Sequence, residues 1–491
     1  MIRRWPALCV LTLSLLAAVH AADLPTTWPV PTSGSQWYRL VLLGQPSGYM
    51  SSLTRLVHDP AGAEQLQTVE HQEIKVAMAG QNLRIVSDQV TTYGRDLGPV
   101  RWQLRLDKMG VIQEVSARRV GDSLQVTSLE SGVTSTQTYL LSKDFAGDVG
   151  VFWAVAHGDL QPGQTRTFQV FLPQLAALDD EVVTVGPVET LPVQGRPTKT
   201  FPLAIETKQL AMRLNVWVDE QGIPVRLQMP TLLGAQMDQV TQEQALAEIA
   251  PLVLSNSIAL DQTLPAGPQL HRLTLQATAL GQPLDQLLPT SPRQTLKLGA
   301  AGAGTLTITA QEPPPHSATL PVTTAELAPY LQSTRLAPAD DPRIKELARQ
   351  AVGDETDAYR AAVKLMAWTY QRLRKMESEP RPLTALQVLD QGAGDCKDHA
   401  LLMATLARAV GLPSRFVVGL AAIGDHLYYH AWVEVWTGEW VELDPTWNEP
   451  LADAGHLRLG ETALDDLSYS RANLDTGRTV GTLQLQVVDY R

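Results

Sequence analysis

Between residues 35 and 245, apolar and polar side chains alternate in short runs that glycine-containing turns separate. The run at residues 124–127 alternates with a period of two, which is typical of a strand with one buried face. The turn signal Gly121-Asp122 precedes it, and few segments here have the spacing of a helix. The pattern predicts an antiparallel β-rich domain over residues 35–245, either an open barrel or a sandwich.

Residues 246–322 form a second region, in which short strand-like runs lie between proline-rich turns. Pro313, Pro314 and Pro315 are consecutive, and such a segment cannot form a helix or a central strand. We predict a small β module that ends in a stiff proline-rich linker. Proteases should therefore cut first near residues 312–318, and a fragment from about residue 320 should fold alone.

From residue 323 the spacing of apolar residues changes to that of helices. Asp341 followed by Pro342 is typical of a capped helix start and predicts a helix to about residue 351. A longer helix is predicted from about residue 354, with one apolar face toward a core. The residues of that face recur at steps of three and four and are Tyr359, Val363, Met366, Tyr370 and Leu373.

Further helices are predicted over residues 385–389 and 396–410, the second ended by Gly411 and Pro413. The predicted strands that follow cover residues 416–420, 428–435, 440–443 and 483–488. Helices first and a sheet second indicate an α+β domain over residues 323–491. The predicted fold class is multidomain, with N-terminal antiparallel all-β modules and a C-terminal α+β domain.

Residues 1–21 have the layout of a secretory signal peptide: Arg3 and Arg4 precede an apolar run, and small residues lead to a cleavage point after Ala21. The run is short for a membrane span, and a retained N-terminal anchor is the alternative. Cleavage would remove Cys9 and leave Cys396 as the single cysteine of a periplasmic or secreted protein. An unpaired thiol is a liability in an oxidising compartment, which favours a chemical role for it.

The length of 491 residues suggests about three domains. The formal charge is −12, from 39 basic and 51 acidic side chains, and no block of Lys or Arg occurs. Such a surface is a poor partner for nucleic acid, so none is expected. Membrane contact is expected only through the signal peptide, if it stays uncleaved.

Cys396, His430 and Asp444 together offer the parts of a thiol-based catalytic triad. Cys396 opens a predicted helix, whose N–H groups and dipole favour a thiolate and can hold an oxyanion. His430 and Asp444 lie on consecutive predicted strands and supply a base for the thiol and an acceptor that orients the base. Each residue alone is more often structural, so the hypothesis rests on the three together.

The hairpin between the two strands determines whether His430 and Asp444 can meet. Residues 436–438 predict a three-residue loop with glycine in its last position. This loop would place Val435 opposite Glu439, and His430 directly opposite Asp444 on one face of the sheet. A two-residue loop would place them on opposite faces and would leave no triad.

A zinc site is the competing interpretation of these residues. Neither CxxC nor HExxH is present, so we expect no metal site, and GxSxG of serine hydrolases is also absent. The zinc ligands would have to come from Cys396, His399, His426, His430 and His456.

Two residues are candidates for the substrate cleft. Trp432 is the tryptophan expected nearest to the triad, whereas most tryptophans of this region are expected to pack the sheet. Gln391, which precedes Cys396 by five residues, is a candidate for a second oxyanion donor. Arg415 could bind the carboxylate of a substrate or form an internal salt bridge, and we expect the salt bridge.

Four separate blocks resemble the transglutaminase-like superfamily in order and spacing. They are GDCKDHA at 394–400, GLPSR at 411–415, HAWVEV at 430–435 and WVELDPT at 440–446. The resemblance covers about residues 323–491, and GHLRL at 455–459 also fits bacterial members. It implies a papain-like α+β fold with Cys396 as nucleophile, His430 as general base and then acid, and Asp444 as the residue that orients the histidine.

The β-rich region resembles, more loosely, the open half-barrels of bacterial envelope proteins that shield apolar ligands. The matching segments are LGQPSGY at 43–49 and WVDEQGIPV at 217–225.

These observations predict an exported cysteine-dependent acyl-transfer enzyme that acts on amide bonds through a thioester and needs no cofactor. Hydrolysis of peptide or isopeptide bonds, as by a peptidase or amidase, is the first expectation. Transglutaminase-type protein cross-linking is the second, and a non-catalytic envelope assembly or binding protein with a vestigial triad is the third. The expected partner is a peptide or protein substrate, with cell-envelope substrates included. The superfamily spans all of these activities, so it constrains the mechanism more than the substrate.

Overall fold

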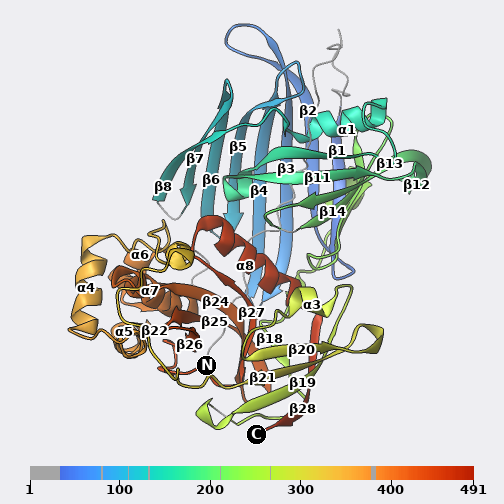
Figure 1. Cartoon of the computed structure of the whole chain (residues 1–491). Coiled ribbons are helices and arrows are strands. Elements are labelled where there is room, and N and C mark those ends of the chain that lie inside the picture. Colours follow the sequence, from blue (N-terminus) through green and yellow to red (C-terminus); the bar gives the residue numbers. More distant parts are fainter. Residues whose placement is uncertain are drawn as a thin grey trace. The chain divides into compact units, whose positions relative to one another are not determined.

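The computed structural model describes residues 34–491, apart from 79–80, 109, 131–132, 211, 266 and 377–382 (Figure 1). Contacts divide the chain into two compact units that part between Leu254 and Ser255. The predicted signal peptide lies outside the described residues. Among the helices that are described, none has the length and apolar character needed to cross a membrane.

The first unit is built on an antiparallel sheet. Its helical segments are α1 (Asp148–His157), η1 (Pro173–Leu175) and α2 (Gln242–Leu246). Its strands are β1 (Ser35–Leu42), β2 (Gln45–His58), β3 (Glu64–Met78), β4 (Gln81–Tyr93), β5 (Pro99–Lys108), β6 (Val111–Val120), β7 (Ser123–Glu130), β8 (Val133–Leu140), β9 (Phe145–Ala146), β10 (Thr165–Leu172), β11 (Ala177–Val185), β12 (Glu189–Val193), β13 (Arg196–Thr207), β14 (Arg213–Val218), β15 (Pro224–Met229), β16 (Ala235–Val240) and β17 (Leu252–Leu254).

Each strand from β1 to β8 pairs antiparallel with the next one along the chain. β1 also pairs with β16, and the ladder continues through β15, β14, β13, β11 and β10. Beyond β10 lies β9, in a short parallel pairing. The antiparallel β region that the alternating pattern predicted is confirmed.

The flanks of this sheet share an aromatic core. Trp102 of β5 packs edge to face on Phe145 of β9 and Phe171 of β10, with ring centroids 6.0 and 5.3 Å apart. Strands far apart along the ladder thus share one core, so the sheet is strongly curved. Helix α1 buries Val151 and Phe152. The sequence did not predict α1, because a helix buried on most sides lacks the polar face that periodicity reveals.

The second unit contains both β and α elements. Its helical segments are η2 (Gly267–Gln269), α3 (Leu284–Leu287), η3 (Ala300–Gly302), η4 (Ala325–Tyr330), α4 (Pro342–Val352), α5 (Ala358–Arg372), α6 (Ala385–Gln391), α7 (Cys396–Ala409) and α8 (Asp466–Thr479). Its strands are β18 (Ser257–Ala259), β19 (Arg272–Ala279), β20 (Gln294–Leu298), β21 (Gly304–Thr309), β22 (Arg374–Lys375), β23 (Ala393–Gly394), β24 (Ser414–Ile423), β25 (His426–Trp436), β26 (Trp440–Leu443), β27 (His456–Thr462) and β28 (Leu483–Tyr490).

The centre of this unit is a sheet against which α7 packs. β25 pairs with β24, and β24 pairs with β27, while β26 and β18 both pair with β25. α7 contacts β24, β25 and the helices α4, α5 and α6, and Figure 1 shows these helices gathered on one side of the sheet. The α+β architecture predicted for the C-terminal part is confirmed.

The region predicted as a small β module is joined to the C-terminal domain by strand pairing. β19 lies between β21 and β28, which is the final strand of the structure. β18 pairs with β25 and so extends the central sheet. A boundary at residue 322 therefore separates strands that pair with each other.

Most of the predicted apolar face of the longer helix meets the core: Met366 and Leu373 are buried, and Tyr359 and Val363 pack against the same core cluster. Tyr370, in contrast, is 38% exposed, and the buried face of α5 also carries Ala358, Ala361, Ala362 and Leu365. Small side chains on that face let neighbouring elements approach closely, and a search for large apolar residues overlooks them. The sequence also did not predict β27 or α8.

Candidate active site

Cys396 is the first residue of α7, and Asp395 caps that helix. One oxygen of the Asp395 carboxylate accepts the backbone N–H groups of Lys397 (2.8 Å) and Asp398 (3.3 Å). In return Asp398 Oδ2 accepts the backbone N–H of Asp395 at 3.0 Å, which completes a capping box. Gly394 permits this turn, because a β-carbon there would lie 2.4 Å from the Asp398 side chain. The capping box therefore fixes Cys396 at the helix start.

Charged groups act on the start of α7. Burial would lower the pKa of Lys397, but the carboxylates of Asp395 and Asp398 outweigh it and raise that pKa. The ammonium group also interacts electrostatically with buried Cys396, which favours a thiolate. Burial and the charge of Asp395 raise the pKa of Asp398 to about 7.

The first turn of α7 faces the strand that carries His430. α7 packs on β25, and Cys396 belongs to the same buried cluster as Ala431, the neighbour of His430. His399 follows Cys396 by one turn. Burial lowers the pKa of His399, and the charge of Asp444 acts in the opposite direction, which places this turn within the field of that carboxylate.

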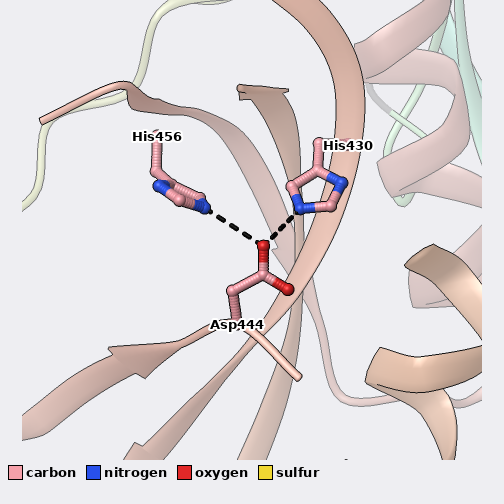
Figure 2. A group of neighbouring side chains, drawn as sticks. All are labelled: His430, Asp444 and His456. Atoms are coloured by element: carbon pink, nitrogen blue, oxygen red, sulfur yellow. Dashed lines mark hydrogen bonds and ion pairs between the residues drawn. The ribbon is translucent and has the colours of Figure 1, made fainter. Parts of the chain in front are cut away.

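His430 and Asp444 are hydrogen-bonded to each other. His430 Nε2 lies 2.6 Å from Asp444 Oδ2, and both side chains are fully buried. In Figure 2 the other ring nitrogen of His430 points away from Asp444. The structure thus brings these two predicted site residues together.

The predicted strand register is wrong by two residues, yet the shared face survives. Val435 lies opposite Val441 rather than Glu439, because Trp436 and Trp440 also pair and leave the loop to residues 437–439. Their rings pack edge to face at 5.4 Å, the kind of cross-strand aromatic pair that stabilises a ladder. A shift of two keeps every side chain on its face, so His430 reaches Asp444 as a diagonal neighbour.

Asp444 is held from several directions. Its Oδ1 accepts the backbone N–H groups of Thr446 (2.6 Å) and Trp447 (3.4 Å). Burial would raise the pKa of Asp444, but His430 and His456 hold it well below its usual value. An ionised Asp444 accepts a hydrogen bond from the Nε2–H of His430, so Nδ1 is the nitrogen that can exchange a proton on the other side of the ring.

His456 joins this group, although the sequence pointed to it only as a zinc ligand and as part of the GHLRL block. Its Nε2 lies 3.3 Å from Asp444 Oδ2, and its Nδ1 lies 2.9 Å from Asp453 Oδ1. His456 begins β27, where it lies opposite Ala421 of β24. The sequence separation of Asp444 and His456 does not predict this contact, because the contact depends on β24 pairing with β25 on one side and with β27 on the other. The GHLRL block was the one available signal.

Two tryptophans lie beside His430 in different ways. Trp432 is fully buried, and its indole N–H donates to Glu442 at 2.8 Å, so its ring packs the core of the sheet. Trp447 is partly exposed and stacks on His430 with ring centroids 4.5 Å apart, against 6.1 Å for Trp432. Trp447, and not Trp432 as expected, is thus the closer of the two tryptophans to the histidine.

The remaining candidates have local partners. The amide of Gln391 donates to the carbonyl oxygen of Ala393 at 3.2 Å. Arg415 forms the expected internal salt bridge, with its guanidinium 2.7 Å from Glu434, and it also lies over the Trp440 ring.

The same residues contain two groups with metal-ligand spacing. The donor atoms of His430, Asp444 and His456 lie within 4.8 Å of one another, as do those of Glu449, Asp453 and His456. A metal requires neutral histidine ligands. Burial would lower the pKa of His456, but its bonds to Asp444 and Asp453 raise it to about 10. A charged His456 donates hydrogen bonds through its ring nitrogens and offers no lone pair to an ion, so the donor set fits a hydrogen-bonded network better than a metal site.

Comparison with known proteins adds a family to this geometry. Residues 345–445 match the model of the transglutaminase-like superfamily. They form a transglutaminase-like domain. The match includes Cys396, His430 and Asp444 and ends one residue beyond the aspartate. The superfamily supports assignment of this domain to a family of cysteine-dependent enzymes.

An uncharacterized protein of Mycobacterium leprae (strain TN) is 37% identical over 71 residues, or 13% of this chain. The chain spans a quarter of the length of that curated relative, 25%. Among solved structures, a candidate cysteine protease from Cytophaga hutchinsonii is 16% identical with a TM-score of 0.31, over 45% of this chain and 88% of its own. A β-barrel-like protein from Brucella abortus is 13% identical with a TM-score of 0.31, over 42% of this chain and 96% of its own.

Proposed function

We propose that this chain is an exported cysteine-dependent enzyme that hydrolyses peptide or isopeptide bonds through a thioester. The observation that carries the proposal is the 2.6 Å contact between His430 Nε2 and Asp444 Oδ2, on a strand against which the Cys396 helix packs. The transglutaminase-like domain supports the same chemistry, because it contains all three residues.

In the first half of the reaction, the Cys396 thiol gives its proton to His430 Nδ1, and the sulfur attacks the amide carbon of the substrate. The Asp444 carboxylate stabilises the imidazolium that forms. His430 then returns the proton to the leaving nitrogen, the C–N bond breaks, and a thioester and a free amine remain.

In the second half, His430 takes a proton from water, and the hydroxide attacks the thioester carbon. The C–S bond breaks, the proton returns to sulfur, and the carboxylic acid leaves. If an amine replaces water, the same steps give a new amide bond, which is the cross-linking alternative.

Export is a separate part of the proposal, and it rests on residues 1–21. The exported protein, once purified, should begin at Ala22 or within a residue of it. An N-terminus that still carries Trp5 would contradict cleavage and support the alternative of a retained N-terminal anchor.

Alkylation of Cys396 tests the proposed nucleophile without a known substrate. Because α7, Lys397 and His430 favour the thiolate, iodoacetamide should modify native Cys396 below pH 7, as measured by mass spectrometry of its peptide. The Cys396→Ser variant is the control for activity on a peptide mixture with and without a fluorescent primary amine. Labelling only near pH 8.5, where an ordinary thiol ionises, would contradict a catalytic role. Incorporation of the amine in place of hydrolysis would instead support cross-linking.

A further inference from the structure

His456 is a fully buried histidine with a carboxylate at each ring nitrogen. Nε2 lies 3.3 Å from Asp444 Oδ2, and Nδ1 lies 2.9 Å from Asp453 Oδ1. Since ionised carboxylates only accept hydrogen bonds, both nitrogens carry protons and the ring is an imidazolium. Figure 2 shows His430 and His456 on either side of one Asp444 oxygen.

Carboxyl groups and a guanidinium surround His456. Glu449 Oε2 lies 4.0 Å from Nε2 and adds a third carboxyl group. Burial would lower the pKa of His456, but the bonds to Asp444 and Asp453 raise it to about 10. The guanidinium of Arg293 is a cation and lies 3.5 Å from the backbone carbonyl oxygen of His456. On α7, the charge of Asp444 also acts on His399.

We propose that His456 is a positioning residue of the proposed triad: a permanent imidazolium that anchors Asp444 and places a positive charge beside His430, the base for the thiol. This inference rests on the proposed function, because it assigns His456 a role toward that reaction. Asp453 is the second part of the device, because it holds the Nδ1 proton of His456 and so fixes the orientation of the ring.

The charge has a consequence that a purely structural histidine would lack. The ring centroids of His430 and His456 are 5.8 Å apart. A positive charge at this distance disfavours protonation of His430 and favours the thiolate, so it moves the acidic limb of the pH profile to lower pH. Coulomb's law with an effective dielectric constant of about 20 gives a displacement of up to about two pH units.

The His456→Gln variant removes the charge and keeps an amide that can donate to Asp444. We expect the acidic limb of Cys396 alkylation to move up by about one to two pH units in this variant, as measured by peptide mass spectrometry between pH 4 and 9. The matched control is His426→Gln, since His426 lies on β25, pairs with Asp425 and is partly exposed. The control should leave the limb unchanged.

The Asp453→Asn variant separates charge from packing. Like His456→Gln, it disturbs the contact between His456 and Asp453, but it removes a negative charge instead of a positive one. In this variant the acidic limb of Cys396 alkylation should stay at the wild-type pH or move to lower pH. Loss of rate in both variants with neither limb moved would show that His456 serves packing alone and would overturn the proposal.

A measurement on the unaltered chain covers the case in which His456→Gln fails to fold. In ¹⁵N-histidine NMR spectra, one buried ring should keep both N–H protons from pH 5 to 9, and Asp453→Asn should shift its Nδ1–H signal. Spectra without such a ring at pH 7 would overturn the inference. If wild-type Cys396 reacts only as an ordinary thiol while this signal is present, the proposed function fails and the charged His456 stands.

Discussion

At the scale of single residues, one carboxylate organises the site. Asp444 accepts hydrogen bonds from two backbone N–H groups on Oδ1 and from His430 and His456 on Oδ2. With these donors in place, the carboxylate has little freedom to rotate and stays ionised although it is buried. The orientation of His430 therefore depends on Asp444, whose side chain is itself fully buried.

The Asp444→Asn variant tests this dependence. The amide would donate a hydrogen bond to His430 Nε2, so the ring proton would move to Nδ1. A protonated Nδ1 cannot accept the proton of the thiol. We expect iodoacetamide to react with Cys396 about a hundredfold more slowly at pH 6, as an ordinary thiol would. Asp425→Asn is the matched control, because Asp425 also bonds a histidine of β25 but is exposed. An unchanged rate in Asp444→Asn would defeat the triad.

At the scale of elements, the packing of three neighbouring strands, β25, β24 and β27, requires a position without a side chain in the middle strand, β24. Gly419 of β24 lies between His430 of β25 and Arg458 of β27. A β-carbon at this position would lie 2.2 Å from the Leu457 carbonyl oxygen and 2.5 Å from the Trp432 ring. The absence of a side chain thus lets Trp432 pack over β24 and keeps the strands that carry His430 and His456 in register.

Gly419→Ala should therefore destabilise this unit by about 1–3 kcal/mol, because neither the backbone oxygen nor the buried indole can move aside easily. The midpoint of urea unfolding, followed by circular dichroism, measures the effect. Gly477→Ala is the control: nothing lies within 4 Å of its added β-carbon, and alanine favours its helix α8. The control should be neutral or stabilising, and an equal loss in both variants would refute the steric explanation.

At the scale of the whole molecule, residues 255–322 contribute to the core of the C-terminal domain. β18 and β19 pair with β25 and β28, and Arg293 bonds the buried carboxylate of Glu442 at 2.6 Å. Burial would raise the pKa of Glu442, but Arg293 and Arg458 hold it at about 2. Glu442 in turn accepts the indole N–H of Trp432. These contacts argue against the independent folding that the proline-rich linker suggested.

We therefore expect residues 255–491 to fold as a soluble fragment and residues 320–491 to remain unfolded or insoluble. The shorter fragment leaves β28 without β19 and a buried Glu442 without Arg293, and breaking one buried ion pair costs about 3–5 kcal/mol. Circular dichroism and size-exclusion chromatography of both fragments measure the outcome. A monomeric, cooperatively unfolding 320–491 fragment would contradict this prediction.

The sequence by itself determined what depends on neighbours along the chain. The Gly394-Asp395-Cys396 cap predicts where α7 begins, and the period of two predicts that His430 and Asp444 share a face even though the expected register was two residues off. Tertiary structure alone decided which distant segments complete the site. His456 reaches Asp444 because β27 pairs with β24, and Arg293 reaches Glu442 because residues 255–322 pack against the central sheet. Local sequence patterns determine where turns form and on which face of a strand a side chain lies. The pairing of distant strands depends on burial and on the pairing of buried charges, which only the assembled core provides.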